Sequence, residues 1–85
     1  MKTDIDGLKV EIDPAKASDW HAFSLLRQAN GKSQFEQFDV LMELVEYITD
    51  QTEESIVAHL GGDTAQAAEV VTLVSRIIQA ATPKN

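Results

Sequence analysis

The sequence contains no cysteine, so the chain can form neither a disulfide nor a thiolate zinc site. Cationic residues are also scarce. Seven Lys and Arg residues stand against 14 Asp and Glu residues, which gives a formal net charge of −7 at pH 7. Because an acidic chain repels nucleic-acid phosphates and anionic lipid, we expect no nucleic-acid partner and no membrane partner. The sequence also lacks an apolar run long enough to span a membrane, and its N-terminus lacks the apolar segment of a secretory signal.

Glycine, proline and aromatic residues are few as well, with four Gly, two Pro, three Phe, one Tyr and one Trp. The hydrophobic fraction of 44% is nevertheless ordinary for a globular protein, so we do not expect disorder. A chain of 85 residues that begins with methionine is interpreted as a complete small reading frame, folded as one domain over residues 1–85. A core of this size is often completed by oligomerisation.

Residues 3–13 predict a β-hairpin. Asp6-Gly7 is a typical two-residue turn, because a type I′ turn requires positive φ at both central positions. This turn would place Ile5 opposite Leu8 and Thr3 opposite Val10. The apolar side chains of the second strand would then share one face, formed by Leu8, Val10 and Ile12.

Helical periodicity begins after Pro14 and predicts about four helices over residues 18–82. The first would be capped by Ser18 and would end at Asn30-Gly31. The expected caps and ends of the others are a capping box at Ser33 and Glu36, an N-cap at Thr52, a stop at Gly61-Gly62, a second capping box from Asp63 to Gln66, and a stop at Pro83. The sequence therefore predicts a mostly α fold with a short N-terminal β-hairpin, in the α+β class.

The last predicted helix is unusually apolar for a surface helix. From Thr64 to Ala81 its only charged residues are Glu69 and Arg76. Either this helix is central in the bundle or it contacts another chain, and both can hold. We place the candidate protein-binding surface on this helix, at Val70, Leu73, Val74 and Ile77.

The only tryptophan, Trp20, lies in the first turn of the first predicted helix. It flanks the apolar stripe of that helix and is one turn from Phe23. We expect the indole to cap the core between the hairpin and the helices. Direct contact with a partner is the alternative role.

The sequence offers little that could perform catalysis. His21 lies two residues from Asp19, so the two side chains do not face each other on a helix, and Gly61-Gly62 is expected to end the helix between His59 and Asp63. We expect both histidines to be structural or solvated. There is no glycine-rich phosphate loop, and no serine lies in a nucleophile motif. We therefore expect no enzyme activity, no metal and no cofactor, and we interpret the chain as an acidic protein-binding module.

The order of the sequence features resembles that of the short tail assembly chaperones of long-tailed (siphoviral) bacteriophages and prophages. The resemblance covers nearly the whole chain, and the stretch from Asp19-Trp20 to Leu25-Leu26 is its most telling part. Members often have a glycine at the end of the second helix, where this chain has Tyr47-Ile48-Thr49-Asp50. The other positions that carry it are Gly7 at the hairpin turn, Ile12-Asp13, His59-Leu60, Gly61-Gly62 and the Val- and Ile-rich last helix.

The resemblance implies a non-enzymatic role in phage tail assembly. Such proteins keep the long apolar helices of the tape measure protein soluble and then give way to the tail tube protein. They usually self-associate, and a longer frameshifted form would recruit tube subunits. The implied location is the cytoplasm of the bacterial host, with no place in the mature virion. Two alternatives stay open: a small acidic regulatory or inhibitory protein that binds a single host target, and an enzyme subunit whose site is completed across an oligomer.

Overall fold

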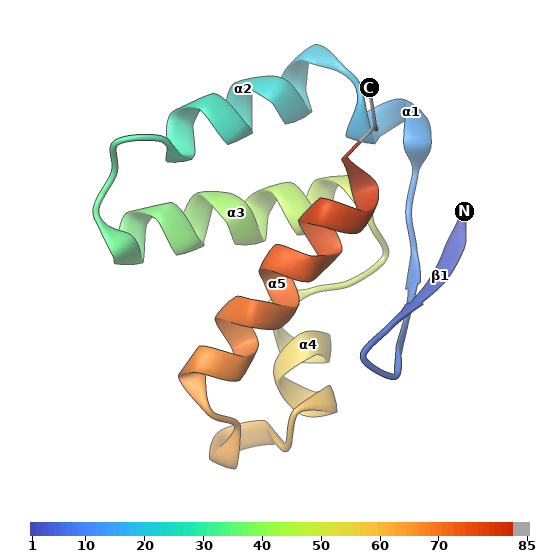
Figure 1. Cartoon of the computed structure of the whole chain (residues 1–85), viewed down its shortest axis with the longest axis vertical. Helices are drawn as coiled ribbons and strands as arrows, with labels where there is room; N and C mark the ends of the chain where they lie inside the picture. The colour runs from blue at the N-terminus through green and yellow to red at the C-terminus, as the bar shows by residue number, and fades with distance from the viewer. Residues whose placement is uncertain (83–85) are drawn as a thin grey trace.

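The computed structural model describes residues 1–82, which form an N-terminal β-hairpin followed by helices (Figure 1). The mostly α fold with an N-terminal hairpin is therefore confirmed. Among the described residues, no helix has both the length and the apolar character needed to cross a membrane. The helix stop predicted at Pro83 lies outside the described residues. The elements in chain order are β1 (Lys2–Ile5), β2 (Leu8–Glu11), α1 (Pro14–Ala17), α2 (Trp20–Ala29), α3 (Gln34–Ile48), α4 (Glu53–His59), the 3-10 turn η1 (Gly62–Thr64) and α5 (Ala67–Ala81).

The hairpin has the predicted register, with Ile5 opposite Leu8 and Thr3 opposite Val10. Both turn residues adopt positive φ, 53° at Asp6 and 85° at Gly7, as a type I′ turn requires. On the predicted apolar face of β2 and its extension, Val10 and Ile12 are buried and Leu8 is half-buried.

The second strand is attached to the segment that follows α3. Ile12 forms an isolated antiparallel bridge with Thr49, and the Asp13 N–H donates to the Ile48 carbonyl at 2.8 Å. The Glu11 N–H donates to the Asp50 carboxylate at 3.0 Å, and this hydrogen bond lowers the pKa of Asp50. An isolated two-stranded hairpin is marginal in water, so these contacts with the end of α3 help to hold it in place.

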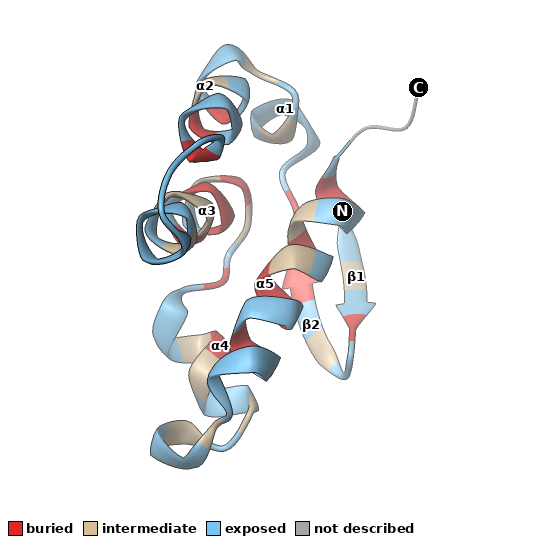
Figure 2. Ribbon diagram, turned by 60° about the vertical axis from the view of Figure 1, so that its left-hand side comes forward, coloured by how far each residue is buried: buried red, intermediate tan, exposed pale blue. Residues whose placement is uncertain are grey.

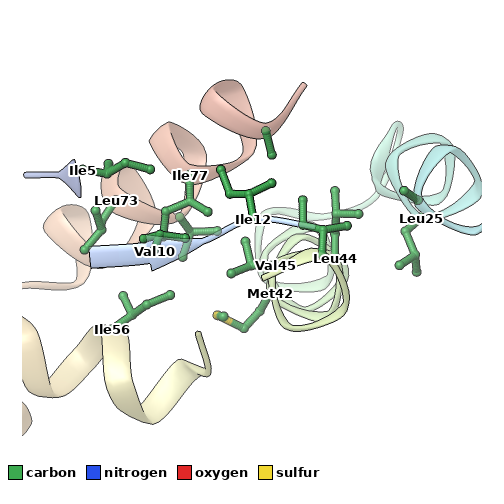
Figure 3. Close-up of a cluster of buried hydrophobic side chains, with 14 of the residues drawn as sticks. Ile5, Val10, Ile12, Leu25, Met42, Leu44, Val45, Ile56, Leu73 and Ile77 are labelled. Atoms are coloured by element: carbon green, nitrogen blue, oxygen red, sulfur yellow. The ribbon is translucent and has the colours of Figure 1, made fainter. Parts of the chain in front are cut away.

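Helix α5 occupies the centre of the fold. One face of it packs against α3, α4 and β1, and the opposite face is exposed (Figure 2). Figure 3 shows side chains from β2, α3, α4 and α5 meeting in one cluster, which Leu44 and Leu25 extend toward α2. Of the two roles considered for the last helix, the central position is confirmed.

Two boundaries near the first helix differ from the prediction. Residues 14–17 form a short helix, α1, where a plain connection was expected, because Pro14 fits the first turn and the Asp13 side chain caps it. The predicted N-cap of the next helix, Ser18, is wrong. The Ser18 hydroxyl instead donates back to the Pro14 carbonyl at 3.0 Å, and Asp19 caps α2 by accepting from the Ala22 N–H at 2.9 Å.

The start of α5 also differs from the prediction. The capping box expected from Asp63 to Gln66 does not form, and α5 begins at Ala67 without a side-chain cap. Gly61 and Gly62 both adopt positive φ, and residues 62–64 turn as a 3-10 helix in which Thr64 bonds back to the Gly61 carbonyl. Because Asp63 belongs to that turn, its side chain is not placed at the helix start.

Candidate functional site

The surface predicted on the last helix is not a surface. Val70, Leu73, Val74 and Ile77 are all buried, and Leu73 is only 2% exposed. The physical reason is the central position of α5, whose broad apolar stripe is covered by α3 on one side and by α4 and the hairpin on the others. The assignment of these four residues to a protein-binding surface is therefore wrong, and they belong to the core.

The core role predicted for Trp20 is also wrong, because its side chain is 69% exposed. Helix α2 buries Ala22, Leu25 and Ala29 against the fold, and Trp20 lies outside that stripe. Its ring lies 5.3 Å from that of Phe23, which is itself 53% exposed, and the Arg27 guanidinium lies 5.6 Å from the indole centroid. We call Trp20 and Phe23 the α2 aromatic patch, and its contact with a partner stays a prediction.

An apolar depression lies between the N-terminal halves of α3 and α5, with α4 beside it. The two helices diverge toward their N-terminal ends (Figure 1). We call the depression the α3–α5 groove; its volume is about 730 Å³. It is lined by the apolar residues Phe35, Phe38, Val57, Ala67, Ala68, Val70 and Val71 and by the polar residues Gln34, Asp39, Glu53 and Thr72.

Phe35 is the most exposed large apolar side chain along the groove, at 87%. It lies in the first turn of α3, one residue after the helix starts behind the Ser33 cap. On the opposite wall Val71 is 44% exposed, whereas Val70 beside it is buried. Because the Phe35 ring is exposed, it contributes little hydrophobic stabilisation to the fold. The groove beside it is therefore an apolar surface that residues 1–82 leave uncovered.

The groove is not apparent from the sequence, because Phe35 shares the helical stripe of Phe38 and Met42. That periodicity shows which face is apolar but not how far along the helix the covering elements reach. The usable indication was length. Helix α3 has 15 residues, and on the groove side its N-terminal half is flanked by residues of the seven-residue α4 and of α5 over 67–72.

No family model, curated protein or solved structure matches this chain. The resemblance to tail assembly chaperones therefore stands on the sequence features alone.

The polar side chains of the groove are all exposed, and two of them, Asp39 and Glu53, are carboxylates. No Lys or Arg of residues 1–82 lines the groove, so the lining contains no cationic side chain to pair with these carboxylates. The Glu53 N–H donates to the Glu46 carboxylate at 3.2 Å, which links the start of α4 to α3. The groove is therefore apolar inside and acidic along its α3 and α4 side.

The remaining titratable contacts serve the fold. The Tyr47 hydroxyl donates to the Asp19 carboxylate, which lowers the pKa of Asp19 and raises that of Tyr47. The His21 and Tyr47 rings pack edge to face at a centroid distance of 4.5 Å. Asp19 thus both caps α2 and ties it to α3.

The second histidine joins α4 to the hairpin. The His59 Nε2 atom lies 3.0 Å from the Asp6 carbonyl oxygen, and the Arg76 guanidinium donates to the Asp6 carboxylate at 2.9 Å. Both contacts converge on the hairpin turn from α4 and α5. Over residues 1–82, no three His, Cys, Asp or Glu side chains gather as a candidate metal site.

Proposed function

We propose that this protein is a non-enzymatic tail assembly chaperone that binds an amphipathic helix of the tape measure protein in the α3–α5 groove. The observation that carries the proposal is the exposed Phe35 beside an open apolar groove. An amphipathic helix laid in a hydrophobic groove is a recurring mode of peptide recognition, and it uses apolar residues at intervals of three and four as its contacts.

The lining of the groove favours a protein segment over a small ligand. The volume of about 730 Å³ lies in the range of small-molecule pockets. However, its four polar lining residues, Gln34, Asp39, Glu53 and Thr72, are all exposed, so none is placed in the interior to fix the orientation of a small molecule. An apolar helix face needs no such group, because its own backbone hydrogen bonds are satisfied.

The resemblance to phage tail assembly chaperones supplies the identity of the client. A tape measure protein presents long apolar helices that need cover until the tail tube encloses them. The proposal also includes self-association, later displacement by the tail tube protein, action in the cytoplasm of the bacterial host, and absence from the finished virion. The net charge of −7 supports it, because a charged coat keeps a complex with an apolar client in solution.

The proposal is tested by co-expressing the chain with the tape measure protein of the same genome. We expect the wild-type chain to hold the tape measure protein in the soluble fraction and to co-purify with it. The Phe35→Asp variant should fold, since a carboxylate in the first turn of α3 is favoured by the helix dipole. We expect this variant to lose the client.

The matched control is Trp20→Asp, which makes the same kind of change on the α2 aromatic patch. We expect it to retain the client. If Phe35→Asp retains the client and Trp20→Asp loses it, the binding surface is the α2 aromatic patch and the groove assignment is wrong. A wild-type chain that leaves the tape measure protein insoluble, but forms a one-to-one complex with a single host protein, would favour the regulatory alternative.

A further inference from the structure

The charge of the chain is distributed very unevenly. Residues 1–32 carry five acidic residues and five Lys and Arg residues, so they are balanced. Residues 33–82 contain a single cationic residue, Arg76, and that side chain is paired with Asp6 at 2.9 Å. Over the same range there are nine acidic residues, namely Glu36, Asp39, Glu43, Glu46, Asp50, Glu53, Glu54, Asp63 and Glu69.

Several of these carboxylates follow one side of the α3–α5 groove. Asp39 and Glu53 line it directly. Glu43 and Glu46 continue from Asp39 at spacings of four and three residues, so the three lie in one exposed row along α3. The hydrogen bond from the Glu53 N–H to Glu46 joins this row to the start of α4. We call Asp39, Glu43, Glu46 and Glu53 the acidic row.

We infer that the occupant of the groove is a cationic amphipathic helix, whose apolar stripe contacts Phe35 and Val71 while Lys or Arg residues on one flank face the acidic row. This inference rests on the proposed function and narrows the kind of helix that can fill the site. The groove supplies apolar contact without selecting among apolar helices. The acidic row adds selection, because carboxylates on the flank of an incoming helix would be repelled by Asp39 and Glu53.

The charge requirement is tested with two designed helical peptides that share one leucine stripe. One carries lysines on both flanks of the stripe and the other carries glutamates at the same positions. We expect the lysine peptide to bind at least about tenfold more tightly at low salt, since complementary charge adds to a common apolar contact. The difference should largely vanish in 1 M salt, where the screening length falls to about 3 Å.

The double variant Asp39→Asn, Glu53→Gln removes the two carboxylates that line the groove. We expect it to weaken binding of the lysine peptide by about three- to tenfold, because exposed ion pairs are individually weak. The matched control is Asp63→Asn, Glu69→Gln, which removes the same charge from two exposed residues that do not line the groove. This control should bind the lysine peptide as the wild-type chain does.

The results separate this inference from the proposed function. If both peptides bind equally and Phe35→Asp abolishes both, the charge requirement is wrong and the apolar groove stands. An equal loss in the two double variants also overturns the inference, because the effect is then one of net charge and not of the acidic row. If neither peptide binds, a cationic amphipathic stripe is not sufficient and the inference is wrong, while co-expression with the tape measure protein still decides the proposed function.

Discussion

Replacing Leu73 and Phe35 in turn by alanine should show that the first side chain stabilises the fold and that the second, in the groove, does not. Leu73 is buried on α5, so the change to alanine removes three core carbons, worth about 0.8 kcal/mol each. The cavity left behind raises the expected cost to about 3–4 kcal/mol. This is a large part of the free energy of unfolding of a domain of 85 residues, which is typically about 4–13 kcal/mol.

Phe35→Ala changes a larger side chain but should cost no more than about 0.5 kcal/mol, because the ring is 87% exposed. Thermal unfolding followed by circular dichroism measures both. At about 4–8 °C per kcal/mol, Leu73→Ala should lower Tm by roughly 12–30 °C and Phe35→Ala by about 2–4 °C at most. Near-wild-type melting of Leu73→Ala would refute the central placement of α5. If Phe35→Ala lowers Tm by more than about 10 °C, the phenyl ring is packed inside the folded protein and is not exposed.

Three further variants test the structure elsewhere. Trp20→Ala should cost less than about 1 kcal/mol, because the indole is exposed, and the wild-type tryptophan fluorescence should change little on unfolding. Gly7→Ala should cost about 1 kcal/mol in denaturant unfolding, because φ is +85° there, whereas the added Cβ would make only ordinary van der Waals contact with the His59 ring. The pKa of Asp19 is lowered in the fold by Tyr47, so its contribution to stability is present above its unfolded pKa and should be lost as the pH falls below about 4. The pKa of Tyr47 is raised by Asp19, so its contribution is present below its unfolded pKa and should be lost as the pH rises through the folded pKa; Tyr47→Phe should remove the alkaline loss in pH-dependent unfolding curves.

Much of the fold follows from local rules that act within a few residues. The Asp6-Gly7 turn fixes the hairpin register, and the caps at Ser33 and Thr52 place the starts of α3 and α4. These features depend on backbone geometry and on hydrogen bonds between near neighbours, which the sequence displays directly. The same rules gave a wrong prediction for the start of α5, because Asp63 lies in a 3-10 helix that follows Gly61 and not at the start of α5.

The site followed from local rules much less well, because exposure depends on how far neighbouring elements reach. Val70 and Leu73 looked like an excess of apolar surface, but the hairpin and α4 cover α5 from the side that periodicity alone left open. Phe35 looked like the start of a core stripe, but no element covers the first turn of α3 completely. In one case buried residues were predicted to be exposed, and in the other an exposed residue was predicted to be buried. Both errors have one cause, because helix periodicity shows which face is apolar but not how much of that face the neighbouring elements cover.

The adjacent residues Asp19 and Trp20 show how one short sequence feature divides between fold and surface. Asp19 caps α2 and accepts from the Tyr47 hydroxyl, so two separate contacts fix the direction in which the first turn of the helix begins. That direction places the indole in solvent beside Phe23, with the Arg27 guanidinium over its ring. Replacement of Asp19 should therefore disturb how α2 is attached to α3, whereas replacement of Trp20 should leave the fold intact. Stability accounts for the aspartate but not for a tryptophan at this position, which leaves contact with a partner as the role to be tested.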